Sequence, residues 1–324
     1  MRETSFIAKN KEKWLDFEAK ITGKAPASPE DLSGLYIHLM NDLSYARTFY
    51  PKSKTILYLN DLAVQAFLKI YGTKSGEGNR LLHFFKDEVP LTVYRYRRYL
   101  YYAFAFFFLF VAIGVMSSVY DHRFIRLILG DGYVNMTLEN IKSGDPLAVY
   151  KSGSNWGSHI GITLNNLRVG IYNYILGFFG GIGTLYILLK NSLMIGAFQY
   201  MFFKYGVFLE SIKGIWIHGS MEIFAVVVEA AAGLVLGAGI LFPRTYSRIQ
   251  SLKIAARDSL KIFLSTFPFT IAAGFLEGYV TRYYREMPGW LSAGIILGTL
   301  GLISYYYLVY PHIRMGQIQF HKIK

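Results

Sequence analysis

Three ionisable residues interrupt one apolar stretch of this chain, and their types and spacing could do chemistry. His218, Glu222 and Glu229 lie within the run from Ile215 to Phe242. At about 100° per residue, offsets of four and seven positions place all three on one face of a helix. A charged side chain at mid-bilayer costs roughly 2.5–3.5 kcal/mol on insertion scales, so each carboxylate needs a partner, a proton or a wet cavity.

A fourth ionisable residue, Glu277, lies in the next predicted span, and the four residues allow several interpretations. They could bond neighbouring helices, conduct protons or ions along a ladder of acids, form a metal or catalytic site, or bind a partner. His218 and Glu222 have the i, i+4 spacing of two metal ligands, but the predicted spans contain no second histidine and no HExxH motif. We therefore predict no bound metal, no cofactor and no catalytic residue.

A second polar group brackets a glycine-rich segment. It contains Asn165, Asn166, Arg168, Asn173 and Asn191. The first asparagines could cap a helix at the membrane surface. Arg168 could instead pair with Glu222 or Glu277, because a nearby cation lowers the free energy of an ionised buried acid. Asn191 is expected to satisfy backbone groups in a turn.

Long apolar segments must position these side chains, and they predict an all-α fold built as a transmembrane helical bundle. The stretch from Tyr99 to Tyr120 carries no charge in 22 residues, which is enough to cross about 30 Å of hydrocarbon. Lys190 and Asn191 interrupt a later apolar run and are interpreted as a tight inner turn, and 121–163 as an external segment. About six spans are predicted, at 99–120, 167–189, 192–208, 215–242, 262–281 and 289–310.

Glycine pairs at four-residue spacing recur along the later part of the chain. Such pairs let two helix backbones approach closely, as in a compact bundle or a tight homo-oligomer. The pairs are Gly177 with Gly181, Gly233 with Gly237, Gly274 with Gly278, and Gly294 with Gly298. We expect these positions to lie where helices pack.

Residues 1–98 differ from the rest in composition and predict a small cytoplasmic helical bundle. They contain 16 Lys and Arg and 11 Asp and Glu. A helix start is signalled by Ser28 as N-cap and Pro29 at the first helical position. A further helix over 79–98 is expected to break or kink near Pro90. The polar beginning of the chain does not resemble a secretory signal peptide.

The net charge of +13 follows the loops and excludes some classes of function. Basic residues cluster beside the predicted spans and in a basic tail at 311–324, as the positive-inside rule expects for a cytoplasmic face. This distribution predicts a multi-pass protein of the inner membrane with both termini in the cytoplasm. Membrane lipids are the expected partners of the basic residues, and no nucleic acid is expected. Because the chain has no cysteine, it has no disulfide framework and no thiol nucleophile.

Three segments together resemble a known family of integral membrane proteins. They are NNLRVGIYNYILGFFGGIGTLYILLKNSLMIGAF, HGSMEIFAVVVEAAAGLVLGAGILFP and AAGFLEGYVT. The chain resembles the stage II sporulation protein M family over about residues 40–310, including the N-terminal stretch LYIHLMNDLSYARTFYP of longer members. The most specific element is the block formed by His218, Gly219 and Glu222. The sequence has Asn191-Ser192 where the family often has Asn-Gly.

The resemblance implies a protein that recruits others rather than an enzyme. In spore-forming bacteria, the family name implies a membrane component that brings peptidoglycan-degrading enzymes to the envelope. In other organisms it implies a membrane protein often encoded beside MoxR-type ATPases, and this chain has the long N-terminal region of that broader group.

Taken together, the residues and the resemblance favour a non-enzymatic membrane scaffold or accessory subunit. Its expected partners are envelope enzymes or a MoxR-type ATPase system. Two alternatives remain open at this stage: a proton-coupled transporter or channel that uses Glu222, Glu229 and Glu277, and an intramembrane hydrolase.

Overall fold

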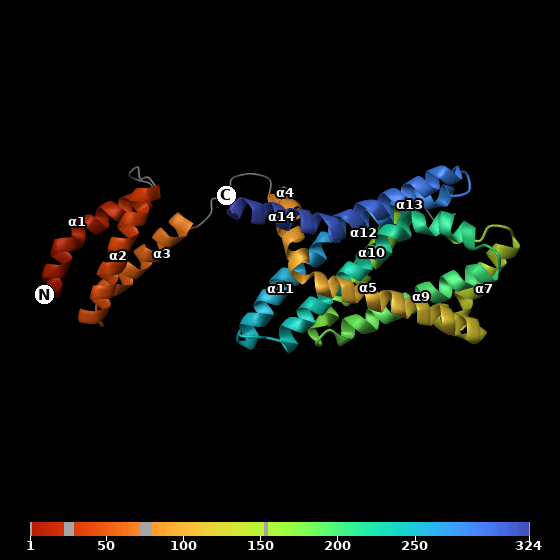
Figure 1. Cartoon of the computed structure of the whole chain (residues 1–324), viewed down its shortest axis with the longest axis horizontal. Coiled ribbons are helices and arrows are strands. Elements are labelled where there is room, and N and C mark those ends of the chain that lie inside the picture. The colour runs from red at the N-terminus through yellow and green to blue at the C-terminus, as the bar shows by residue number, and fades with distance from the viewer. Residues whose placement is uncertain (1, 23–28, 72–79, 152–154, 324) are drawn as a thin grey trace. The chain divides into compact units, whose positions relative to one another are not determined.

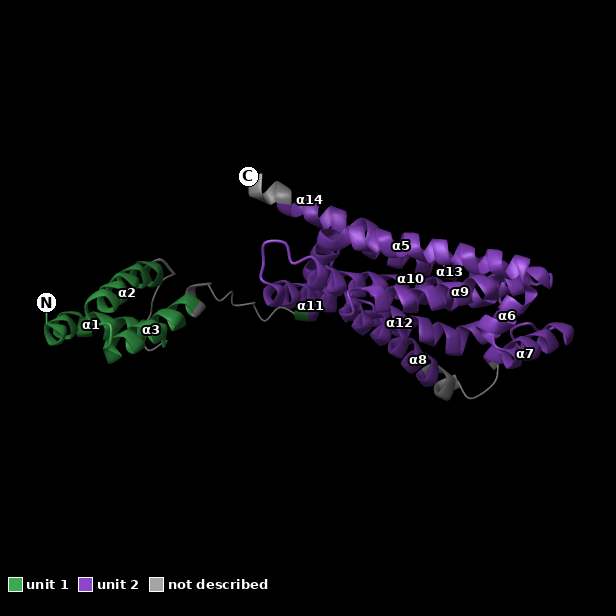
Figure 2. Cartoon of the chain, turned by 90° about the horizontal axis from the view of Figure 1, so that it is seen from below, with its two compact units in different colours: residues 1–80 green, residues 81–324 purple. Residues whose placement is uncertain are grey.

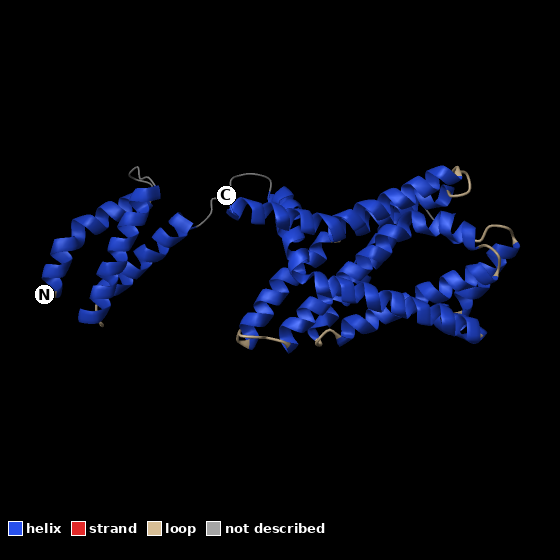
Figure 3. Ribbon diagram, in the orientation of Figure 1, coloured by secondary structure: helices blue, strands red, loops and turns tan. Residues whose placement is uncertain are grey.

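The chain folds into two compact units in the computed structural model (Figure 2). These are Met1–Arg80 and Leu81–Lys324, which we call unit 1 and unit 2. The structure describes residues 2–22, 29–71, 80–151 and 155–323. Within them, the regular structure is helical and no strand occurs, which confirms the predicted all-α fold (Figure 3).

Unit 1 is a three-helix bundle. It consists of α1 (Glu3–Ile21), α2 (Pro29–Phe49) and α3 (Lys54–Tyr71). Its apolar core includes Trp14, Phe17, Leu39 and Leu59, all at most 4% exposed. The indole Nε1 of Trp14 donates a 2.8 Å hydrogen bond to Asp42 Oδ2 and so joins α1 to α2. Each helix therefore contributes one apolar stripe to a core that belongs to this unit alone.

The predicted boundary of the N-terminal bundle at residue 98 is wrong. After α4 (Arg80–His83), the π-helical turn η1 (Phe84–Glu88) leads directly into α5 (Val89–Tyr120), and all three are continuous with unit 2. The expected break near Pro90 takes the form of this π-helical turn. Pro90 has no N–H to donate within this continuous helix, and the carbonyl oxygens of Phe85 and Lys86 accept hydrogen bonds from the hydroxyls of Tyr306 and Tyr310 at 2.8 and 3.0 Å.

Four helices in the described part of unit 2 are long and apolar enough to cross a membrane, so the predicted count of about six was approximate. They are Arg80–Tyr120, Phe208–Leu241, Arg248–Tyr283 and Gly289–Ile318. The second is α10 (Phe208–Leu241), the helix that carries the ionisable residues. Its most apolar window is 67% buried, against 22% and 17% in the first and last of the four. Helix α10 is the central helix of unit 2, because α5 and most of the unit's other long helices, whose bounds follow below, pack around it (Figure 1).

The turn predicted at Lys190 and Asn191 is wrong, and with it the spans 167–189 and 192–208. The structure has α8 (Asn155–Ile175), a short 3-10 turn η3 (Leu176–Phe178) and α9 (Ile182–Lys204). The chain reverses at Gly180 and Gly181, whose φ angles of +66° and +85° are readily reached only by glycine. The chain therefore turns at this glycine pair and not at Lys190 and Asn191.

The C-terminal helices also run further than the sequence predicted. The span expected at 262–281 begins earlier as α11 (Arg248–Ser265) and continues through α12 (Phe267–Phe275), the π-helical turn η4 (Leu276–Val280) and η5 (Thr281–Tyr283). The tail expected at 311–324 is part of a helix, since α13 (Gly289–Ser304) continues through η6 (Tyr305–Val309) into α14 (Tyr310–Ile323). Arg314 Nε donates a 2.6 Å hydrogen bond to Asp87 Oδ1 and holds α14 beside η1.

The segment predicted to be external, 121–163, is largely helical where it is described. It contains α6 (His122–Leu129), α7 (Asp131–Lys142), the short η2 (Ala148–Lys151) and the start of α8. Gly130, with a φ of +83°, separates α6 from α7. These helices cover one end of α9 and α10 and contribute side chains to the site described next.

Candidate functional site

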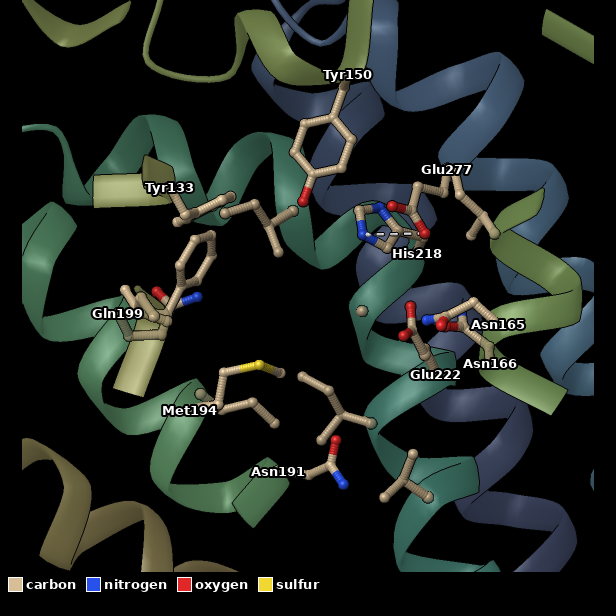
Figure 4. Close-up of a pocket in the computed structure, with 18 of the residues that line it drawn as sticks. Tyr133, Tyr150, Asn165, Asn166, Asn191, Met194, Gln199, His218, Glu222 and Glu277 are labelled. Atoms are coloured by element: carbon tan, nitrogen blue, oxygen red, sulfur yellow. Dashed lines mark hydrogen bonds and ion pairs between the residues drawn. The ribbon is translucent and has the colours of Figure 1, made fainter. Parts of the chain in front are cut away.

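A pocket of about 610 Å³ lies in unit 2 against the first half of α10 (Figure 4). We call it the α10 pocket. Side chains from α6, α7, η2, α8, α9, α10 and η4 line it. Its polar residues are Tyr133, Tyr150, Asn165, Asn166, Asn191, Gln199, His218, Glu222 and Glu277. The pocket thus gathers residues that are up to about half the chain apart in sequence.

His218, Glu222 and Glu277 form a cluster on one wall of the α10 pocket. One potential ligand atom from each lies within 4.8 Å of the corresponding atoms of the other two. His218 is only 3% exposed, and its Nε2 lies 3.9 Å from Glu277 Oε2. The π-helical turn η4 carries Glu277 to this position, and such turns often mark functional sites because the extra residue redirects side chains.

The hydroxyl of Thr281 orients the imidazole of His218. Thr281 Oγ1 donates to the carbonyl oxygen of Leu276 at 3.2 Å and lies 2.9 Å from His218 Nδ1. A hydroxyl has one proton, so Thr281 accepts from His218 and Nδ1 carries the ring hydrogen. The unprotonated Nε2 of a neutral ring then faces the carboxylate of Glu277. The Nε2 lone pair and an oxygen of Glu277 are therefore close together in a buried position.

Two asparagines lie beside the Glu222 carboxylate. Figure 4 shows the amide groups of Asn165 and Asn166, both from α8, next to this side chain. Asn165 Nδ2 donates to Asn166 Oδ1 at 3.5 Å, whereas the buried Asn166 Nδ2 has no hydrogen-bond acceptor among the described residues. An amide donor thus remains available within the pocket.

Two tyrosines from the helices before α8 close the other side of the pocket. Burial raises the pKa of Tyr133 to about 12. Burial, and after it the charge of Glu277, raises the pKa of Tyr150 well above its usual value. The Tyr150 ring lies 5.5 Å from the imidazole of His218, measured between centroids. Both phenols are therefore neutral near pH 7 and can donate hydrogen bonds into the pocket.

Glu229 belongs to a different environment, although it shares the helix face with the cluster. It is 1% exposed, does not line the α10 pocket, and accepts a 3.0 Å hydrogen bond from Thr266 Oγ1. Its carboxyl group packs against Gly170 of α8, where an added Cβ would come within 2.6 Å of it. The predicted ladder of acids is thus divided, with Glu222 and Glu277 at the pocket and Glu229 between packed helices.

Asn173 also bonds helices together rather than facing the pocket. It is fully buried, and its Nδ2 donates to the carbonyl oxygen of Val226 on α10 at 2.9 Å. Thr184 Oγ1 on α9 donates to the Asn173 carbonyl oxygen at 2.7 Å. Three helices are therefore joined at this residue. Asn191 does line the pocket, but it lies inside α9 and donates to its own helix at Ile187.

The suggested pairing of Arg168 with Glu222 or Glu277 is wrong. Arg168 is exposed on α8, and its Nε donates to Tyr172 Oη on the same helix at 3.4 Å. In the described residues it forms no ion pair with either acid.

Two of the predicted glycine pairs face each other. A Cβ on Gly177 would lie 2.2 Å from the Gly233 carbonyl oxygen, and a Cβ on Gly237 would lie 2.3 Å from the Gly181 nitrogen. Because Gly181 has a positive φ, the first pair lies in the turn between α8 and α9 rather than within one helix. The backbone of this turn thus packs directly on the second half of α10.

The other two pairs have different surroundings. A Cβ on Gly274 would lie 2.2 Å from Thr163 Oγ1 of α8, and Gly278 is buried in η4. Added Cβ atoms on Gly294 and Gly298 of α13 would meet no described atom within 4 Å. The last pair therefore does not mediate close packing among the described residues of this chain.

Sequence reasoning missed Tyr133, Tyr150, Gln199, Thr266 and Thr281. Thr281 follows Glu277 by four residues, a spacing that could have suggested a shared helix face. The two tyrosines come from the segment taken as external, and nothing in their local sequence links them to α10.

Comparison with known proteins assigns the family. Residues 103–282, more than half of the chain, match the family model for stage II sporulation protein M. The chain belongs to the stage II sporulation protein M family. The match covers α8, α9 and α10 and includes Glu277, so the α10 pocket of this family member lies largely within the family region. The membership agrees with a multi-helix membrane protein.

Unit 1 of this stage II sporulation protein M family member matches a different model. Residues 4–72 match a domain of unknown function (DUF8413). A relative named Uncharacterized protein MJ0706, from Methanocaldococcus jannaschii, is 31% identical over 126 residues, which are 38% of this chain and 55% of that protein. The chain therefore spans about half the length of this relative. No solved structure matches the chain.

Proposed function

We propose that this protein is a non-enzymatic scaffold or accessory subunit of the inner membrane, with unit 1 as the part that captures a protein partner. The observation that carries the proposal is the division into two units with separate cores and separate family matches. A membrane unit joined to a small helical unit is suited to holding a partner at the membrane. Both termini are proposed to lie in the cytoplasm, on the side favoured by the basic residues.

The surface of unit 1 supports a protein partner rather than a small ligand. Ile37 on α2 is 62% exposed, and Leu57 and Val64 on α3 are 72% and 50% exposed. Leu57 and Val64 are seven residues apart and share one helix face. Apolar side chains gathered on a small domain favour binding to another protein. We propose a MoxR-type ATPase as the partner of unit 1 and an envelope or peptidoglycan-remodelling enzyme as the partner of unit 2.

Affinity purification of the full-length protein from native membranes tests this function. We expect a stoichiometric partner with the wild-type protein, and we expect the Leu57→Asp and Val64→Asp double variant to lose it. Leu15→Asp is the control on α1, where Leu15 is 51% exposed. It adds one negative charge, as Leu57→Asp and Val64→Asp each do, and should keep the partner that either single variant on α3 weakens. Recovery of the wild-type protein alone in mild detergent would contradict the proposal.

A further inference from the structure

We infer that His218, Glu222 and Glu277 bind a divalent transition-metal cation of the Zn²⁺ or Mn²⁺ class in the α10 pocket. The three residues supply one imidazole nitrogen and two carboxylates, and their potential ligand atoms lie within 4.8 Å of one another. Ligands at about 2.1 Å from a tetrahedral metal are about 3.4 Å apart. Small rotations of the two glutamate side chains are therefore enough to bring all three atoms onto one ion.

The histidine is already oriented as a metal ligand. Thr281 accepts the Nδ1 hydrogen at 2.9 Å, which leaves the lone pair of Nε2 directed toward Glu277 at 3.9 Å. Metal-bound histidines usually donate their other ring nitrogen to such an outer group, which fixes the ring and the tautomer. His218 is 3% exposed, so Nε2 cannot turn to bulk water. A cation between Nε2 and Glu277 would take the nitrogen lone pair and a carboxylate oxygen as two of its ligands.

Charge balance points to a dication. None of the described residues that line the α10 pocket is a lysine or an arginine, and Arg168 bonds to Tyr172 instead. Two carboxylates and a neutral imidazole carry a net charge of −2, which one divalent cation neutralises. Ionised groups without a counter-charge are strongly disfavoured in a low-dielectric interior. The metal would therefore stabilise an arrangement that is otherwise unfavourable.

The ligand set and the space around it restrict the kind of metal. Imidazole suits Zn²⁺ and other transition metals, whereas Mg²⁺ and Ca²⁺ prefer sites made only of oxygen ligands. Three protein ligands leave at least one coordination position open toward the pocket of about 610 Å³. The amide of Asn166 and the phenols of Tyr133 and Tyr150 lie around that space. A metal-bound water or an oxygen of a small anionic ligand fits there.

Titration of metal into the full-length protein tests the inference. The protein, purified in mild detergent and stripped with a chelator, is titrated with ZnCl₂ and MnCl₂ by calorimetry. We expect one ion per chain. His218→Ala, Glu222→Gln and Glu277→Gln should each weaken binding more than about tenfold, and Thr281→Val by about 10- to 100-fold. Glu229→Gln is the matched control on the same helix outside the pocket and should bind as the wild type does.

A second measurement keeps the test independent of how well the variants fold. Wild-type protein loaded with CoCl₂ should show the visible absorption bands of a low-coordinate Co²⁺ ion with nitrogen and oxygen ligands. Absence of Zn²⁺ and Mn²⁺ binding, binding of CaCl₂ alone, or unchanged affinity in all three ligand variants would overturn the inference. Loss of binding in Glu229→Gln equal to that in Glu222→Gln would overturn it as well. Partner recovery does not enter this test, so it is separate from the proposed scaffold function.

Discussion

The two halves of α10 carry similar residues but have opposite surroundings. His218, Gly219 and Glu222 in the first half face the α10 pocket, and a Cβ on Gly219 would meet only ordinary contacts, the nearest 3.7 Å away. In the second half, Glu229 packs against Gly170 of α8 and bonds to Thr266, and a Cβ on Gly233 would lie 2.2 Å from Thr184 Oγ1 of α9. The comparison teaches that a buried acid in a membrane helix is not by itself a functional residue, because its neighbours decide its role.

The largest expected difference between the halves concerns their glycines. Gly237→Val would place carbon atoms against the backbone of Gly180 and Gly181, which cannot move aside, so we expect the unfolding free energy to fall by about 3 kcal/mol or more. Gly219→Ala should instead raise it by roughly 0.5–1 kcal/mol, because the helix gains an alanine without a clash. Thermal unfolding in detergent measures both. Equal destabilisation by Gly237→Val and Gly219→Ala would mean that Gly219 does not face open space in the pocket.

Asparagines on the two sides should also differ. Asn173→Ala removes the bond to the buried Val226 carbonyl oxygen and should lower the unfolding free energy by about 1–3 kcal/mol, although the bond from Thr184 to the backbone of residue 173 is kept. Asn191→Ala removes only a bond within α9 and should lower it by less than about 1 kcal/mol. The same thermal measurement applies, and a larger loss for Asn191→Ala would contradict this division.

The packing of Glu229 on Gly170 predicts a coupling between two substitutions. Gly170→Ala alone should destabilise, because its Cβ would lie 2.6 Å from the Glu229 carboxyl group. In the double variant with Glu229→Ala that clash is absent. The loss of unfolding free energy in the double variant should therefore differ from the sum of the two single-variant losses by about 1 kcal/mol. A double-mutant cycle of unfolding free energies measures this difference. Strictly additive effects would show that the two groups do not touch.

The smallest expected effect is a pH dependence in the pocket half. The pKa of Tyr133 is raised to about 12, above the unfolded value of about 10. Its contribution to stability is complete below about pH 10 and is lost as the pH rises toward 12, because the unfolded chain releases the proton first. Thermal midpoints between these values should fall less steeply in Tyr133→Phe than in the wild type. Identical slopes of thermal midpoint against pH in the two proteins would show that Tyr133 is exposed to solvent.

Local patterns were enough to predict α10 and the helical class of the chain. The apolar run and the helical spacing of His218 and Glu222 depend only on nearby residues, and α10 indeed carries both toward one space. The division between Glu222 and Glu229 could not be predicted in this way. It depends on Gly170 of α8, more than fifty residues earlier, which packs on one acid and not on the other.

The errors in the helix boundaries have a similar origin. Lys190 and Asn191 are polar enough to suggest a turn, yet both are accommodated within α9, where Asn191 bonds to Ile187 and the Lys190 ammonium lies 5.8 Å from the Tyr186 ring centroid. The true turn uses Gly180 and Gly181; of these, only Gly181 was singled out from the sequence, and only for helix packing. Backbone conformation at positive φ therefore determined the hairpin, and charge did not.

Single-cysteine labelling in native membranes tests the difference between the two halves of α10 most directly, because the chain has no cysteine of its own. Gly219→Cys lies on the pocket wall, and Ala230→Cys is the control in the packed half, where Ala230 is 0% exposed. We expect a small thiol reagent to modify Gly219→Cys rapidly, more slowly with ZnCl₂ present, and to leave Ala230→Cys unmodified until the protein is denatured. Equal labelling of the two variants in the folded protein would contradict the account.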